Sequence, residues 1–301
     1  MKSVAQSPGL VVLVALVAVG LPAGEPAQSK TSGKPWTRSV FVSVVDPSGA
    51  PVLGLGPADF EVSEGGIKRE VVKAGLATTP MRIAVFADTS DGASNAVNPL
   101  RAALTAFADA IPAPHELMLI STGRQMRVRV QPTTDRKKFK DAASSLFSDG
   151  GATPLMDALI EADDRFLKKA DDRWPVLVIV SSDGTEGSAG VSENRFNDWV
   201  KGLPARGIAA HAIVLKYKGG SMAEVVANHV AVTLNGSYDA INTSNSLADK
   251  LKTIADRLMQ DYQVASAKYE VAFATPSTSG PVMIGVAREG VRVSTTIGRL
   301  R

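Results

Sequence analysis

Apolar and polar positions along the middle of the chain predict alternating strands and helices. Between Arg82 and Ile241, short apolar runs alternate with stretches whose apolar residues recur at helical spacing. The run Val176–Val180 is uninterrupted and rich in β-branched residues, which is typical of a central parallel strand covered on both faces. Strands that alternate with helices imply right-handed crossovers. We therefore predict an α/β fold with a doubly wound, mainly parallel sheet and helices on both of its faces.

The spacing places each element of this central unit, which we expect to span residues 80–262. Met126–Val130 alternates and begins shortly after the run Leu117–Ile120, so it is expected to be an antiparallel hairpin partner of that run. The other strands are expected at 83–86, 176–180, 208–215 and 237–241, and the helices near 100–111, 134–147, 154–169, 192–203, 221–234 and 245–262.

The two flanks have a period of two, which predicts strands. In residues 38–78, alternating apolar positions are interrupted by turns such as Asp46-Pro47-Ser48-Gly49. Residues 263–301 show the same alternation. Neither piece is long enough to bury a core alone. We therefore expect the C-terminal strands to pair with the N-terminal ones in a small β module.

The first 27 residues predict a signal peptide. Lys2 precedes an apolar run, Gly9–Leu21, which is followed by small residues and a proline. The run is short for a membrane span but suits a leader that is removed on export. An uncleaved N-terminal anchor is the alternative. With cleavage, no membrane span remains, and the protein is expected in the periplasm, on the cell surface or outside the cell.

Composition narrows the possible chemistry. The chain has 33 basic and 30 acidic residues and no long basic run, which argues against a nucleic-acid partner. It has no cysteine, which excludes disulfides and thiolate chemistry. The three histidines lack metalloprotease spacing, and His211, in an apolar strand, is expected to be a hydrogen-bonded core residue. There is no phosphate-binding loop, dinucleotide glycine pattern or nucleophile elbow.

Oxygen-bearing side chains follow the apolar runs at one predicted edge of the sheet. Asp88 and Ser90 come after the first central strand, Asp183 follows Val176–Val180, and Thr153 lies in a glycine-rich loop that opens a helix. Ligands of doubly wound sheets bind beyond the carboxyl ends of the strands. Two carboxylates and two hydroxyls suit a hard cation such as Mg²⁺, with Mn²⁺ or Ca²⁺ as alternatives.

These motifs resemble those of the von Willebrand factor A family. The family carries Asp-x-Ser-x-Ser after its first strand, a threonine in a glycine-rich loop and Asp-Gly after its fourth strand, which together form a metal-ion-dependent adhesion site. The matching residues here are Asp88, Ser90, Thr153 and Asp183. The flanks, with the segment VDPSGAPVLGLGPADFEVSEGG, resemble those of a bacterial, acidobacterial-type subgroup. The resemblance implies a cation that binds an acidic side chain of a protein partner.

One position departs from the family pattern. Gly92 stands where the family has its second serine, so a direct hydroxyl ligand is missing and the site is degenerate. Each matching residue also has a structural interpretation, since Thr153-Pro154 could be a helix cap and Asp183-Gly184 a turn.

Three functions remain open at this point. The first is an exported, non-enzymatic adhesion or assembly module that binds a protein through its metal. The second is a metal-free scaffold with the same fold, which Gly92 suggests. The third is a phosphatase of the haloacid-dehalogenase type, but that motif needs a second aspartate where this chain has Ser90.

Overall fold

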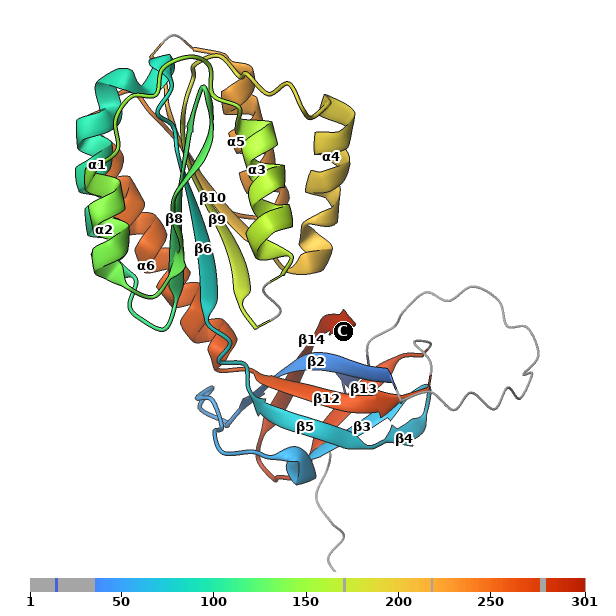
Figure 1. Ribbon diagram of the computed structural model, residues 1–301. Coiled ribbons are helices and arrows are strands. Elements are labelled where there is room, and N and C mark those ends of the chain that lie inside the picture. The colour runs from blue at the N-terminus through green and yellow to red at the C-terminus, as the bar shows by residue number, and fades with distance from the viewer. Residues whose placement is uncertain (1–13, 16–35, 170–171, 218, 277–279, 301) are drawn as a thin grey trace, which may run out of the picture. The chain divides into compact units, whose positions relative to one another are not determined.

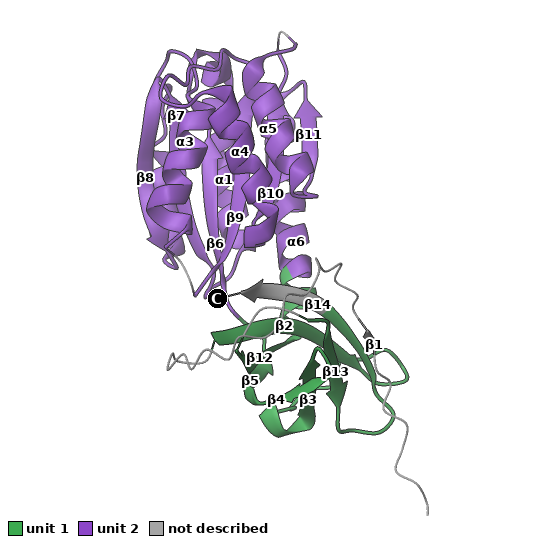
Figure 2. Cartoon of the chain, turned by 90° about the vertical axis from the view of Figure 1, so that its right-hand side faces the viewer, with its two compact units in different colours: residues 1–78, 262–301 green, residues 79–261 purple. Residues whose placement is uncertain are grey.

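The chain forms two compact units. The structure, a computed structural model, describes residues 14–15, 36–169, 172–217, 219–276 and 280–300. Residues 79–261 make the larger unit, and residues 1–78 with 262–301 make the smaller one (Figure 2). The predicted signal peptide lies outside the described residues except for Val14–Ala15.

The larger unit is built on a six-stranded sheet. Its strands are β6 (Met81–Ala87), β7 (Glu116–Gly123), β8 (Gln125–Thr133), β9 (Trp174–Ser182), β10 (Ala209–Leu215) and β11 (Tyr238–Ile241). The order across the sheet is β11-β10-β9-β6-β7-β8. All neighbours are parallel except the hairpin partners β7 and β8. Both the doubly wound sheet and the antiparallel hairpin that the sequence predicts are thereby confirmed.

Helices cover both faces of this sheet. They are α1 (Val97–Ala110), α2 (Arg136–Ser144), α3 (Leu155–Ala162), α4 (Glu193–Gly202), α5 (Met222–Thr233) and α6 (Leu247–Ser266). Figure 1 shows α1, α2 and α6 on one face and α3, α4 and α5 on the other. Alternate residues of the central strands, such as Phe86, Leu177 and Ile179, are fully buried in the core beneath α3–α5. Burying each such side chain contributes about 1.5–3 kcal/mol of transfer free energy.

Two helices are shorter than their apolar spacing predicts. The helix expected over 134–147 ends at Ser144, and the Leu146 carbonyl accepts a hydrogen bond from the Arg101 guanidinium instead. The helix expected over 154–169 changes at Asp163 to a wider π-type turn. The buried Asp163 carboxylate accepts hydrogen bonds from Trp199 and Arg206, and these tertiary contacts accompany the irregular turn.

The smaller unit joins the two flanks in two antiparallel sheets. The strands are β1 (Val14–Ala15), β2 (Trp36–Val45), β3 (Phe60–Glu64), β4 (Ile67–Arg69), β5 (Val71–Leu76), β12 (Tyr269–Thr275), β13 (Val282–Val286) and β14 (Arg292–Leu300). One sheet has the order β1-β13-β3-β4 and the other β14-β2-β12-β5. The predicted pairing of C-terminal with N-terminal strands is confirmed, and both sheets contribute to one core that includes Val40, Phe60, Val271 and Ile284.

A buried carboxylate ties the flanks together. Glu64, at the end of β3, is 1% exposed. It accepts hydrogen bonds from Arg38 of β2 at 2.9 Å and from the Thr275 hydroxyl of β12 at 2.6 Å, and it forms an ion pair with Arg69 at 3.3 Å. Removing one partner of such a group leaves an uncompensated charge, so the pairing of the strands and this cluster depend on each other.

We predict that His211 makes the larger unit sensitive to acid. Its imidazole is 2% exposed, and its Nδ1 accepts a hydrogen bond from the Ser237 backbone N–H at 3.1 Å. Burial, with a smaller contribution from Arg257, lowers the pKa of His211 from 6.5 to about 4. The stabilisation from the neutral ring is complete above the unfolded pKa of 6.5. It falls by about 3 kcal/mol as the pH drops to 4.

Denaturant titrations at several pH values from about 7.5 to about 4 measure this loss of stability, because the range covers both pKa values. His211→Asn keeps an acceptor for the Ser237 N–H and cannot be protonated. Its unfolding free energy should therefore lose this share of the pH dependence. An unchanged slope in the variant would show that other groups cause the acid sensitivity.

Candidate functional site

The predicted site residues lie at the topological switch point of the sheet, where the strand order changes direction. β6 and β9 are neighbours at the centre of the sheet. After β6 the chain goes on to β7 on one side, and after β9 it goes on to β10 on the other. Asp88 and Asp183 are the first residues beyond these two strands. The loops that diverge at such a switch point leave a crevice between them, which is the usual place for a ligand.

Asp88 connects the ends of the two central strands. It is 1% exposed. Its Oδ1 accepts a hydrogen bond from the Ser90 backbone N–H at 2.8 Å, and its Oδ2 accepts from the Ser182 N–H at 2.9 Å and the Ser182 hydroxyl at 2.6 Å. The carboxylate therefore shapes its own loop and holds it against the end of β9, and it does not cap a helix.

The Ser90 hydroxyl is buried beside Asp88. The residue is 1% exposed, and its Oγ has no hydrogen-bond partner within the described part of the chain. A buried polar atom of this kind is uncommon in folded proteins and needs an explanation, such as an ion or a water. The oxygen is therefore available to a ligand.

Thr153 is fully buried in the glycine-rich loop. Its hydroxyl donates a hydrogen bond to the Thr122 hydroxyl at 3.0 Å. Its backbone pairs with the loop after β9, with Thr153 N–H to Thr185 O at 2.9 Å and Gly187 N–H to Thr153 O at 2.8 Å. The N-cap residue of α3 is Pro154, and the first-turn N–H groups of Met156 and Asp157 donate to the side chains of Glu186 and Ser188 instead. The capping interpretation of Thr153 is therefore wrong.

Asp183 is 7% exposed and faces the loop that follows β10. Its Oδ2 accepts hydrogen bonds from the Tyr217 N–H at 2.9 Å and the Gly219 N–H at 2.5 Å. The carboxylate is thus more than part of a local turn, because it fixes a loop 34 or more residues further along the chain.

Gly92 is in close contact with the loop that contains Asp183. A Cβ atom at this position would lie 2.6 Å from the Ser182 Oγ and 2.8 Å from the Gly184 Cα. Real Cβ atoms do not come so close to other atoms, so any side chain here would force the loops apart. Close approach of two backbones explains why glycine stands where the von Willebrand factor A pattern has serine.

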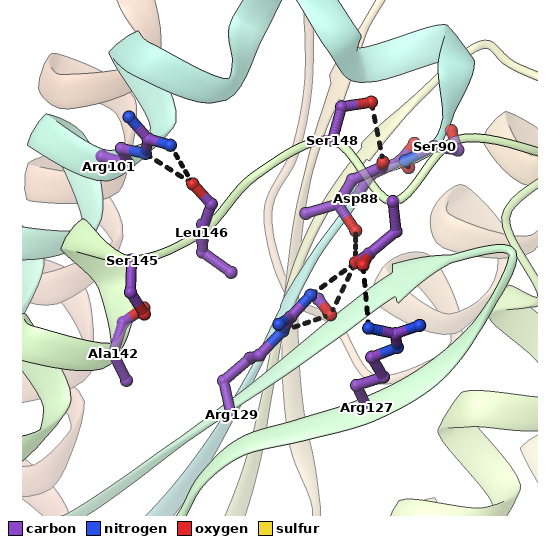
Figure 3. Close-up of polar contacts among 12 residues, drawn as sticks. Asp88, Ser90, Arg101, Arg127, Arg129, Ala142, Ser145, Leu146 and Ser148 are labelled. Carbon is purple, nitrogen blue, oxygen red and sulfur yellow. Dashed lines mark hydrogen bonds and ion pairs between the residues drawn. The ribbon is translucent and has the colours of Figure 1, made fainter.

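A buried ion pair, which we did not predict, supports the rim of the site. The Asp149 side chain is 1% exposed and accepts hydrogen bonds from the Thr89 hydroxyl at 2.7 Å and from Arg129 at 2.5 Å, and it pairs with Arg127 at 3.3 Å. Figure 3 shows Arg127 and Arg129 pointing from the hairpin toward the loop that carries Asp88 and Ser90. Burial alone would raise the pKa of Asp149, but the Thr89 hydroxyl and the two guanidinium groups outweigh it and lower this pKa.

The glycine-rich loop is also bonded directly to the first loop. The Thr89 carbonyl accepts from the Asp149 N–H at 2.8 Å. Asp91 exchanges two bonds with Gly151, from its N–H to the carbonyl at 3.0 Å and from the Gly151 N–H to its Oδ2 at 2.9 Å. Asp91 therefore points to the glycine-rich loop.

The contacts bring the loops of the four predicted residues together at one edge of the sheet. Asp88 and Ser90 share a loop that contacts Ser182, and the Thr153 backbone pairs with the loop after Asp183. Within the described residues, no group of three or more histidine or acidic side chains could hold a metal. The candidate set contains only two carboxylates, so any cation here would depend on hydroxyl oxygens as well.

Comparison with known proteins gives similarity in structure only. No family model matches the sequence, and no curated protein matches it. A solved structure of a von Willebrand factor type A protein from Catenulispora acidiphila is similar, with a TM-score of 0.53 and 13% identity over 89% of this chain and 71% of that one. The chain has a von Willebrand factor A-like fold.

Two further structures with this domain type are more distant. The manganese-loaded TRAP protein of Plasmodium vivax has a TM-score of 0.49 and 12% identity, over 74% of this chain and 95% of that one. Proximal thread matrix protein 1 from the mussel byssus, with a zinc-occupied adhesion-site motif, has a TM-score of 0.47 and 13% identity, over 67% of this chain and 50% of that one.

Among the described helices, none is long and apolar enough to cross a membrane.

We predict that Gly92→Ala destabilises the larger unit by about 1–3 kcal/mol, because the new methyl group would overlap Ser182 and the Gly184 backbone. Gly202→Ala is the matched control, since a Cβ at Gly202, in α4, meets nothing within 4 Å. That control should be neutral or slightly stabilising. Chemical denaturation of both variants measures the difference, and equal stability of the two would contradict the close packing of Gly92.

Proposed function

We propose that this chain is a protein-binding module that holds a divalent cation at the edge of its sheet. Asp88, Ser90, Thr153 and Asp183 would hold the ion, and a carboxylate of the partner would complete its shell. The observation that supports this most directly is the buried Ser90 hydroxyl, which has no partner among the described residues. Two hydroxyls and two carboxylates are the donor types that Mg²⁺ and Mn²⁺ prefer.

The four proposed ligands would bind the ion and orient it toward the partner. When bound, the ion supplies a fixed positive charge that attracts an acidic side chain. Asp88 is aligned by the Ser90 and Ser182 amides, and Asp183 by the loop after β10. No base lies within hydrogen-bond distance of the Ser90 Oγ in the described chain, so this hydroxyl is not an activated nucleophile. These features support binding rather than catalysis.

Positive charge beside the site supports an acidic partner. Arg127 and Arg129 share one carboxylate, that of Asp149, so this cluster keeps one net positive charge. Arg124 is exposed at the tip of the hairpin, has a left-handed backbone (φ 53°), and donates its N–H to the Ala152 carbonyl of the glycine-rich loop at 2.9 Å. Basic groups beside a site speed and orient the approach of negative groups.

Export of the module is also part of the proposal. It is supported by the leader-like apolar run Gly9–Leu21 and by the flanks that resemble a bacterial subgroup of this family. Edman sequencing of the protein isolated from its native host would test it. A mature N-terminus between residues 23 and 28 is the expected result, and an intact Met1 would contradict cleavage.

We predict that the purified protein binds Mg²⁺ or Mn²⁺ and that Thr153→Val and Asp183→Ala weaken the binding about tenfold or more, because each removes one oxygen from the shell. Isothermal titration calorimetry measures the affinity. Thr253→Ala is the control, since Thr253 is exposed on α6 and its hydroxyl bonds to the Asp249 carbonyl of the same helix.

The same titration separates this proposal from a metal-free scaffold. Binding heat in the parent that is retained in the control and lost in both site variants supports a cation site. No heat in the parent, with a folded far-UV spectrum, would instead support a scaffold that keeps the fold without the ion.

We predict that a hexaglutamate peptide binds in the presence of Mg²⁺ and that Arg124→Gln weakens it about threefold to tenfold, as the loss of one charge-assisted contact implies. Lys138→Gln is the charge-matched control, because Lys138 lies in α2, which begins next to the opposite edge of the sheet. Fluorescence anisotropy measures binding with and without chelator. A hexaglutamine peptide that binds equally well would contradict recognition of acidic groups.

A further inference from the structure

The space beside Gly92 is taken by another hydroxyl. The Ser182 Oγ lies 2.6 Å from the position that a Cβ on residue 92 would occupy. The Cβ atom of a serine at 92 would therefore clash with the Ser182 hydroxyl. Ser182 is the last residue of β9 and immediately precedes Asp183. An oxygen from the neighbouring strand thus lies beside the position from which the first loop lacks one.

The hydrogen bonds of Ser182 leave one acceptor position of its hydroxyl oxygen unused. Its hydroxyl proton is donated to the Asp88 Oδ2 at 2.6 Å, and its oxygen accepts the Gly184 N–H at 3.2 Å. A serine hydroxyl has one proton and two acceptor positions. One acceptor position on the oxygen therefore remains, and the proton is already directed away from it.

Burial and polarity also suit a ligand oxygen. Ser182 is fully buried, so bulk water does not compete for the oxygen. Donation of its proton to a carboxylate increases the electron density on the hydroxyl oxygen, as in hydrogen-bonded networks around bound metals. The same carboxylate, that of Asp88, also accepts the Ser90 N–H. Ser90 and Ser182 are consequently held around one anionic group.

We propose that the Ser182 hydroxyl replaces the second serine of the adhesion-site pattern as a direct ligand of the cation. The inference rests on the proposed function, because it names a ligand of that same site. It differs from the family pattern, in which the corresponding hydroxyl comes from the first loop. Gly92 then marks a hydroxyl that has been relocated, and the ion keeps two serine oxygens, those of Ser90 and Ser182.

A single introduced thiol tests direct ligation. The chain has no cysteine, so Ser182→Cys places one sulfur at the proposed position. A thiolate ligand prefers soft cations, so Mg²⁺ affinity should fall and Cd²⁺ affinity should rise, each by about tenfold or more. Cd²⁺ should also produce a sulfur-to-metal charge-transfer absorption in the ultraviolet and release a proton on binding.

Ser181→Cys is the matched control. Ser181 is equally buried, but neighbouring side chains of a strand point to opposite faces, and its hydroxyl bonds to the Ser182 carbonyl at 3.3 Å. This variant should keep the Mg²⁺ affinity of the parent and show no charge-transfer band. If Ser182→Cys behaves like Ser181→Cys while the parent binds Mg²⁺, the inference is overturned and the proposed function stands. A parent that binds no divalent cation overturns both.

A second pair of variants decides the matter if Ser182→Cys does not fold. Ser182→Thr keeps the hydroxyl and should retain the Mg²⁺ affinity within about threefold, whereas Ser182→Ala should lose about tenfold or more. Calorimetry on both variants, with thermal unfolding as a check on folding, provides the comparison. An equal loss of affinity in the two variants would overturn the inference.

Discussion

The carboxylate of Asp88 is the interaction on which the edge of the sheet depends. It is buried, and the three hydrogen bonds it accepts compensate for the water it has lost. Two of those bonds come from Ser182, so the same group that closes its own loop also fixes the end of the neighbouring strand. The positions of Ser90 and Gly92 on one side, and of Asp183 on the other, follow from this connection.

A second set of contacts holds the glycine-rich loop in place around that centre. Asp149 anchors the loop through Thr89, Arg127 and Arg129, and Asp91 bonds to its backbone. These bonds run between the loops themselves and hold them in a defined arrangement. A rigid rim loses little conformational entropy when a partner binds, which favours affinity from a small number of contacts.

The sequence was sufficient for the architecture because its signals are local. The β-branched run Val176–Val180 and the helical spacing of its neighbours determine the sheet and its layers, and the alternation in both flanks determines the β module. The order of Asp88, Ser90, Thr153 and Asp183 along the chain also places them after the correct elements. Each of these signals lies within a few residues of the feature that it predicts.

The remaining features depend on contacts between distant segments, which no local pattern encodes. Asp149 meets Thr89 across 60 residues, and Ser182 meets Asp88 across 94. The turn at Asp163 depends on Trp199 and Arg206, and the burial of Glu64 on Arg38 and Thr275. In sequence, Asp149 and Glu64 look like ordinary polar residues next to glycines, and only the packing of the loops gives them a role.

The contact of Gly92 with Ser182 and Gly184 also limits which residues position 92 can hold. A serine at 92 would meet both a side chain and a main chain, so replacing Ser182 would remove only one of the two obstacles. The turn at Gly184 would have to move as well. A hydroxyl at position 92 therefore requires changes in two loops at once.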